Sequence, residues 1–259
     1  MGELSLQVVL FLVASAFCAG WVDAVVGGGG LIQLPALLVG LPGASPAQIL
    51  ATNKLASICG TSTSAVTYYR RVRPDLRTAI PLAVAAFAGS SLGAVVATRI
   101  PKEAFNPIIL VALVVVGAYT VVKPSLGAST QLRFSGRHHL AAALVIGVVI
   151  GFYDGALGPG TGSFFVFALV GLTGYAFLEA SAKAKIANFA TNLAALVVFI
   201  PHGAVMWPIG VVMGLANIAG GYIGARTAVS RGTGFVRIVF IVVVGAFVVR
   251  IGGQLLGLW

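Results

Sequence analysis

The most informative segment of the chain reads Gly20-Trp21-Val22-Asp23-Ala24-Val25-Val26-Gly27-Gly28-Gly29-Gly30, where an apolar run that starts near residue 4 ends in four glycines. The run at 4–26 is long enough to cross a bilayer as a helix, which takes roughly 20 residues. Each glycine inside a helix costs about 1 kcal/mol relative to alanine, so the cluster predicts that the helix breaks there. Residues 31–41 follow as an apolar piece too short to span a membrane unaided.

The next segment, 46–69, is predicted to be a longer helix with an unusually polar content. Two ordinary spans are expected after it, at 78–98 and 104–122. The polar residues of the longer helix are Thr52, Asn53, Lys54, Ser57, Thr61, Ser62, Thr63 and Ser64.

The second half of the chain repeats the first. A shift of 131 residues without gaps places Gly20-Trp21-Val22-Asp23 on Gly151-Phe152-Tyr153-Asp154 and Lys54 on Lys185. Matched charges carry weight because charged residues are scarce in this chain. We therefore predict two repeats, near 1–125 and 132–259. The second has helices near 139–156, 176–200, 206–228 and 234–256, a short piece at 163–172, and a break at Gly158-Pro159-Gly160-Thr161-Gly162.

The composition is that of an integral membrane protein. Hydrophobic residues make up 59% of the 259, only 8% are charged, and the mean hydropathy is +1.04, whereas soluble domains are roughly a quarter charged. We predict an all-α polytopic protein with about eight to ten membrane segments, which form a single membrane domain over residues 1–259. The net charge of +10 lies mostly in short loops, where topology and anionic lipid headgroups explain it more simply than nucleic acid does.

The positive-inside rule favours inverted repeats. If each short piece and the helix after it cross as a hairpin, each repeat has five segments, and ten basic residues lie inside against three outside. If the short pieces dip in and return, the repeats are parallel and the division is eight against five. In the inverted arrangement the outside holds Arg99, Lys102 and Arg250, and the inside holds Arg70, Arg71, Arg73, Arg77, Lys123, Arg133, Arg137, Arg226, Arg231 and Arg237.

The two glycine breaks predict a site for an anion. Broken helices at matching places in two halves are typical of the substrate sites of transporters. The short helices that start after Gly30 and Gly162 would direct free N–H groups and positive dipole ends into a shared cavity, with Gly29 and Gly160 beside them. The alternative is that these glycines only let helices pack closely.

Lysines within apolar helices are a second sign of function, because a charge at the bilayer centre costs at least about 2.5 kcal/mol. Lys54 and Lys185 occupy equivalent places, so we expect two cations that flank one axis. Asp23 and Asp154, also equivalent, are candidates for proton coupling or for balancing these charges, and ion pairs with them are the alternative to a role in binding. Lys183, nearer the start of its helix, could instead snorkel to the surface.

Polar side chains accompany both lysines. Ser57 and Thr61 follow Lys54 by three and seven residues, and Asn188 and Asn192 follow Lys185 likewise, which places each trio on one helical face. Together with Asn53 they would offer hydrogen bonds to an oxyanion. Hydrogen bonding between helices is the structural alternative for any one of them.

These motifs resemble the sulfite exporter TauE/SafE family, also called toluene sulfonate uptake permeases. The resemblance lies in Gly20–Leu37 with Ala51-Thr52-Asn53-Lys54, and in Gly158–Phe165 with Lys185–Leu196. It implies a multi-pass carrier of the bacterial inner membrane, in a family associated with sulfite, sulfoacetate and other organosulfonates.

We therefore expect a secondary transporter of small sulfur-containing anions that works by alternating access, with export as its direction. The alternatives are an anion channel, a carrier for a small organic anion without sulfur, and a membrane enzyme. The sequence offers no recognisable nucleophile, metal-ligand cluster or nucleotide-binding loop, so we expect neither enzymatic activity, nor a metal, nor a cofactor.

Overall fold

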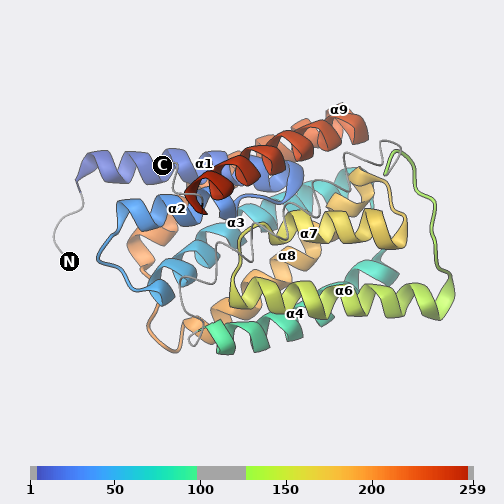
Figure 1. Ribbon diagram of the computed structural model, residues 1–259, viewed down its shortest axis with the longest axis horizontal. Helices are drawn as coiled ribbons and strands as arrows, with labels where there is room; N and C mark the ends of the chain where they lie inside the picture. The colour runs from blue at the N-terminus through green and yellow to red at the C-terminus, as the bar shows by residue number, and fades with distance from the viewer. Residues whose placement is uncertain (1–4, 98–126, 256–259) are drawn as a thin grey trace.

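The computed structural model describes residues 5–97 and 127–255, which form the helical protein in Figure 1. The expected span at 104–122 lies outside the described residues, as do Arg99, Lys102 and Lys123. The helices are α1 (Leu6–Val26), α2 (Gly30–Gly40), α3 (Pro46–Val72), α4 (Leu76–Ala97), α6 (Gly136–Ala156), α7 (Thr161–Ala168), the π-helix η2 (Leu169–Thr173), α8 (Phe177–Phe199) and α9 (Trp207–Leu255).

Both predicted helix breaks are confirmed. α1 ends at Gly27, which has a left-handed conformation with φ of 86°, and α2 begins three residues later. In the second half α6 ends before Gly158 and Gly160, which have φ of 89° and 78°. Only glycine adopts such angles without a steric cost, so these residues fix where the chain leaves the helical path.

The last helix, α9, is divided at Gly232, where φ is 75° and ψ is −170°. The division separates the two helices that the sequence predicts at 206–228 and 234–256. Four described helices are long and apolar enough to cross a bilayer, namely Leu6–Val26, Leu76–Ala97, Gly136–Ala156 and Trp207–Val243. The fold is therefore that of an all-α integral membrane protein, as the composition predicts.

The polar helices α3 and α8 form the centre of the protein. Figure 1 shows them between α1 and α9 on one side and α4 and α6 on the other, and the contacts of α3 with α9 and of α8 with α4 agree. They run in opposite directions, because Gln48 near the start of α3 lines the same pocket as Phe199 at the end of α8, whereas Thr61 later in α3 contacts Asn192 earlier in α8. The apolar outer helices thus shield most polar side chains of the central pair from lipid.

Glycines bring the outer helices into backbone contact. A Cβ atom on Gly89 of α4 would overlap the carbonyl oxygen of Val148 on α6, and one on Gly220 of α9 would overlap that of Phe17 on α1. The shift of 131 residues relates these two contacts, since it converts Gly89 into Gly220 and Phe17 into Val148. The correspondence supports two repeats that pack reciprocally, and small residues are the usual means of such close helix packing in membranes.

One end of the bundle is strongly basic. It gathers the end of α3 with the starts of α4, α6 and α8, because the hydroxyl of Tyr175 contacts Thr78 at 3.3 Å and His139 at 2.8 Å. At the other end, segments 41–45 and 200–206 contain no Lys or Arg. Under the positive-inside rule the basic end would lie inside, and the inverted arrangement of the repeats stays a prediction. The described arginines in the loops and terminal turns of the basic end, or shortly before the break in α9, are Arg70, Arg71, Arg73, Arg77, Arg133, Arg137, Arg226 and Arg231.

Candidate functional site

A small cavity lies where the two helix breaks meet the two polar helices. Its volume is about 20 Å³, which is room for about one water molecule. Most of the residues predicted to form a site line this one cavity. Its walls comprise Asp23, Gly27, Gly30, Asn53, Lys54, Ser57, Asp154, Gly158, Gly160, Thr161, Gly162, Asn188 and Asn192.

The backbone groups released by the two breaks are bonded to each other and to nearby side chains. The amide of Ser163 donates to the carbonyl of Gly27 at 3.0 Å, and its hydroxyl donates to the carbonyl of Val26 at 2.8 Å. The hydroxyl of Tyr153 donates to the carbonyl of Pro159 at 2.7 Å. Lipid offers no hydrogen-bond donors to these backbone carbonyls, so the bonds within the protein satisfy them. The bonds of Ser163 also hold α1 and α7 together at the cavity.

Two buried ion pairs cross between the halves of the chain. Lys54 Nζ lies 2.5 Å from Asp154 Oδ2, and Lys185 Nζ lies 3.0 Å from Asp23 Oδ2. Lys185 also donates to the backbone carbonyl of Asp23. The shift of 131 residues converts one pair into the other. Ion pairing, the alternative left open by the sequence, is therefore the arrangement that the structure has.

The two ion pairs at the cavity are neutral overall when all four groups are ionised. Lys54 and Lys185 are 2% and 0% exposed, so each charge requires its partner, since an unpaired buried ion is strongly unfavourable. A bound anion would upset this balance unless a carboxylate moved away or took up a proton. Anion binding at this site would therefore have to be coupled to a second event.

Three of the predicted site residues do not line the cavity. Lys185 lies behind the Asp23 that it contacts, because its ammonium group is held by that residue's carbonyl as well as its carboxylate. Thr61 lies one helical turn beyond Ser57 on α3, and its hydroxyl accepts from the side-chain amide of Asn192 at 3.5 Å. Gly29 packs against the side of α1, where a Cβ atom would come within 2.6 Å of the carbonyl oxygen of Ala19.

The amide side chains at the cavity differ in their hydrogen bonding. The side-chain oxygen Oδ1 of Asn188 accepts from the Thr191 hydroxyl at 3.4 Å. The Oδ1 atom of Asn53 is buried and has no partner among the described residues, although the residue is only 3% exposed. Buried polar atoms are nearly always bonded, so Asn53 is suited to contact water or a ligand that enters the cavity.

Sequence reasoning missed a polar network next to the site. Gln33 of α2 donates to the backbone carbonyl of Asn53 at 3.3 Å, and its side-chain carbonyl accepts from Asn217 of α9 at 2.7 Å. Both are isolated polar residues in apolar helices, which is the signal that could have identified them. Through Gln33 the short helix α2 supports the backbone beside Lys54.

Lys183 occupies a separate polar cluster outside the cavity. It is fully buried, lies 3.2 Å from Glu179 Oε1, and stacks over the Tyr175 ring at 4.1 Å. The residue therefore does not snorkel. Its charge is balanced within one turn of α8 and on an aromatic face, both common ways to accommodate a buried cation.

Broken helices that meet at a buried charged cavity, enclosed by apolar spans, define a class of integral membrane transporters. The chain belongs to the sulfite exporter TauE/SafE family, whose profile matches residues 12–251. The chain is 37% identical to ORF9 of a Sinorhizobium species, over 97% of this chain and 95% of the relative. It is 37% identical to YfcA of Escherichia coli K12, over 91% and 85%. A Haemophilus influenzae relative is 33% identical, over 91% of both chains. All three are named as probable membrane transporter proteins. No solved structure matches the chain.

Proposed function

We propose that this transporter is a secondary carrier of small sulfur oxyanions, such as sulfite or an organosulfonate like sulfoacetate, across the bacterial inner membrane, with export as its direction. The proposal rests on Lys54, which lines the cavity and whose ammonium group is paired with Asp154 from the other half of the chain. An anion that displaces this carboxylate would gain a charge-assisted hydrogen bond and loosen a contact between the halves.

The closed cavity favours a carrier over an anion channel. Its volume of about 20 Å³ is too small for sulfite, which is several times larger than water. Substrate entry would therefore require the two breaks to move apart. In alternating access this movement opens the site to one side at a time. Counterflow separates the two functions, because internal sulfite should accelerate uptake by a carrier but not by a channel.

The two aspartates are candidates for charge balance or proton coupling. An oxyanion brings negative charge to two ion pairs whose charges already cancel, so uptake of a proton by Asp154 or Asp23 would restore neutrality. In that case sulfite flux would carry protons, and a pH-sensitive dye inside proteoliposomes would record them.

The decisive experiment removes the Lys54–Asp154 pair as a unit. Lys54→Met alone would leave a buried carboxylate without a partner, which costs about 3–5 kcal/mol, whereas Lys54→Met with Asp154→Asn leaves no buried charge. In proteoliposomes with verified folding, we expect sulfite flux of the double variant to fall to the background of empty vesicles. Lys183→Met is the matched control, because it removes a buried lysine outside the cavity and should retain flux.

Normal flux in the double variant would remove Lys54 from the mechanism. Sulfoacetate, taurine and a matched carboxylate such as acetate would be compared as competitors of sulfite. Competition by the carboxylate equal to that by sulfoacetate would favour the alternative carrier of small organic anions without sulfur.

A further inference from the structure

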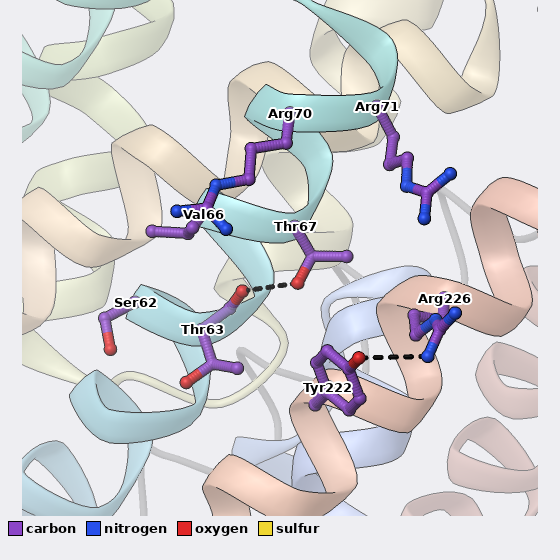
Figure 2. Close-up of a pocket in the computed structure, with 8 residues that line it drawn as sticks. All are labelled: Ser62, Thr63, Val66, Thr67, Arg70, Arg71, Tyr222 and Arg226. Atoms are coloured by element: carbon purple, nitrogen blue, oxygen red, sulfur yellow. Dashed lines mark hydrogen bonds between the residues drawn. The ribbon is translucent and has the colours of Figure 1, made fainter.

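A second pocket lies between α3 and α9, away from the central cavity. This α3–α9 groove has a volume of about 420 Å³, and arginines from both helices line it together with Tyr222. Figure 2 shows the side chains of Arg71 and Arg226 extending into the same opening, with Thr67 at its centre and Arg70 turned toward Val66.

The arginines of this groove lack acidic partners in the part of the chain that the structure describes. The carboxylates of Asp23, Asp154 and Glu179 are engaged by the three buried lysines, and Asp75 accepts from Thr78. Like charges brought together in this way repel one another, so the groove is electrostatically suited to an anion.

The polar groups of the groove fit a phosphate. A guanidinium can hold two phosphate oxygens at once, which an ammonium cannot. Arg226 donates to the Tyr222 hydroxyl at 2.9 Å, so the phenol accepts that bond and retains its own proton to donate to a bound oxygen. Two arginines and a tyrosine from two helices thus converge in one opening.

The position of the groove fits a lipid phosphate better than a free ion. Val66 at its edge and Tyr222 are 50% and 45% exposed. Further along α9, Leu215 and Val211 are 65% and 49% exposed, and they continue an apolar surface away from the basic end. A ligand with a charged head and apolar tails would match this arrangement, whereas a free ion would use only the head region.

We propose that the α3–α9 groove binds the phosphate of an anionic phospholipid headgroup, with its acyl chains along α9. If lipid headgroups were merely attracted to basic loops in general, arginines outside the groove would matter as much as those inside it. A specific site in the groove would depend on its own arginines. The control is therefore a pair of exposed arginines at the same end of the bundle, Arg133 and Arg137.

The test uses the full chain in nanodiscs of phosphatidylcholine with a minority of phosphatidylglycerol, followed by native mass spectrometry. Wild type and Arg133→Gln/Arg137→Gln should both retain phosphatidylglycerol. The amount of phosphatidylglycerol retained by Arg71→Gln/Arg226→Gln should be lower by a factor of about ten or more. The reason is that each lost charge-assisted hydrogen bond weakens binding by roughly that factor. Equal losses in the two double variants would overturn the site.

Two further measurements complete the test. If the glutamine variant does not fold, Arg71→Lys/Arg226→Lys keeps the charge and removes the bidentate geometry, and it should still lose retention relative to wild type. In pure phosphatidylcholine, inorganic phosphate should leave the melting temperature unchanged. Stabilisation by phosphate that equals that by phosphatidylglycerol would overturn the lipid assignment and indicate a site for a soluble anion.

Discussion

The backbone at Gly27 packs directly against Gly162 of the second break. Its φ is 86°, and a Cβ atom there would overlap the backbone carbonyl carbon of Gly162. Gly27→Ala therefore combines backbone strain with overpacking, and we expect it to destabilise the fold by about 3 kcal/mol or more. The apparent melting temperature in detergent measures this loss. Gly43→Ala is the matched control, because a Cβ there meets nothing within 4 Å; equal melting temperatures for the two variants would contradict the expectation.

Lys54 and Lys185 are equivalent in sequence but not in their surroundings. The scarcity of charge made both predictable as buried functional candidates, while pairing with Asp23 or Asp154 was the alternative and the choice of partner was left open. What the sequence could not predict is that Lys185 also contacts the Asp23 carbonyl and is withdrawn from the cavity. That difference depends on side-chain conformations and on how α1 sits against α8, which no local pattern specifies.

At the level of helices, glycine clusters predicted where helices end better than hydropathy predicted which helices lie within the membrane. The breaks after α1 and α6 follow from glycine clusters that continue a helix only at a cost. The division of α9 was expected from two separate apolar runs, and the structure places it at Gly232. The central helices α3 and α8, by contrast, are absent from the four described spans selected for length and apolar composition. Their polar faces pack against each other and against other helices, so their burial is a property of the bundle rather than of their own sequence.

The start of α4 predicts a pH dependence of stability. Asp75 accepts from the Arg77 amide at 2.9 Å and from the Thr78 hydroxyl at 2.7 Å. Burial acts to raise the pKa of Asp75, but the hydrogen bonds from Thr78 and Arg77 and the charge of Lys183 outweigh it and lower this pKa below its usual value. A carboxyl with a lowered folded pKa stabilises the fold above its unfolded pKa of about 3.9, and this stabilisation is lost as the pH falls through the folded value.

The Asp75→Asn variant tests this linkage. Its apparent melting temperature should fall less than that of wild type between about pH 5 and about pH 3, since the other carboxyls are common to both proteins. The difference should correspond to no more than roughly 1 kcal/mol, because Asp75 is largely solvent-exposed. An equal fall in melting temperature for the variant and wild type between these pH values would refute a stabilising role for the ionised form of Asp75.

For the whole molecule, the main question is how the two halves are related. The crossed ion pairs and the reciprocal glycine contacts of α4 with α6 and of α9 with α1 support two halves exchanged by a two-fold axis. The opposite directions of the central helices support an axis in the membrane plane. Such symmetry would let the closed cavity open toward either side by equivalent movements, which is the physical basis of alternating access.

The inverted arrangement makes opposite predictions for the ends of the two short helices. Gly43 follows α2 in the segment without basic residues, whereas Leu172 lies in η2 at the arginine-rich end. In a background in which Cys18 and Cys59 are replaced by alanine, Gly43→Cys should react with an impermeant maleimide on intact cells. Leu172→Cys, 56% exposed in the native residue, should react only after the cells are opened.

Parallel repeats would place both positions on the same side, so they would label together. His202→Cys provides a second outward marker, because it is exposed in the segment beside Phe199 at the same end as Gln48. Labelling of all three cysteines in detergent would verify that each thiol is reactive once the membrane is removed. Opposite labelling of Gly43→Cys and Leu172→Cys on intact cells would then support inverted repeats, the arrangement that the positive-inside rule favours, and equal labelling would contradict it.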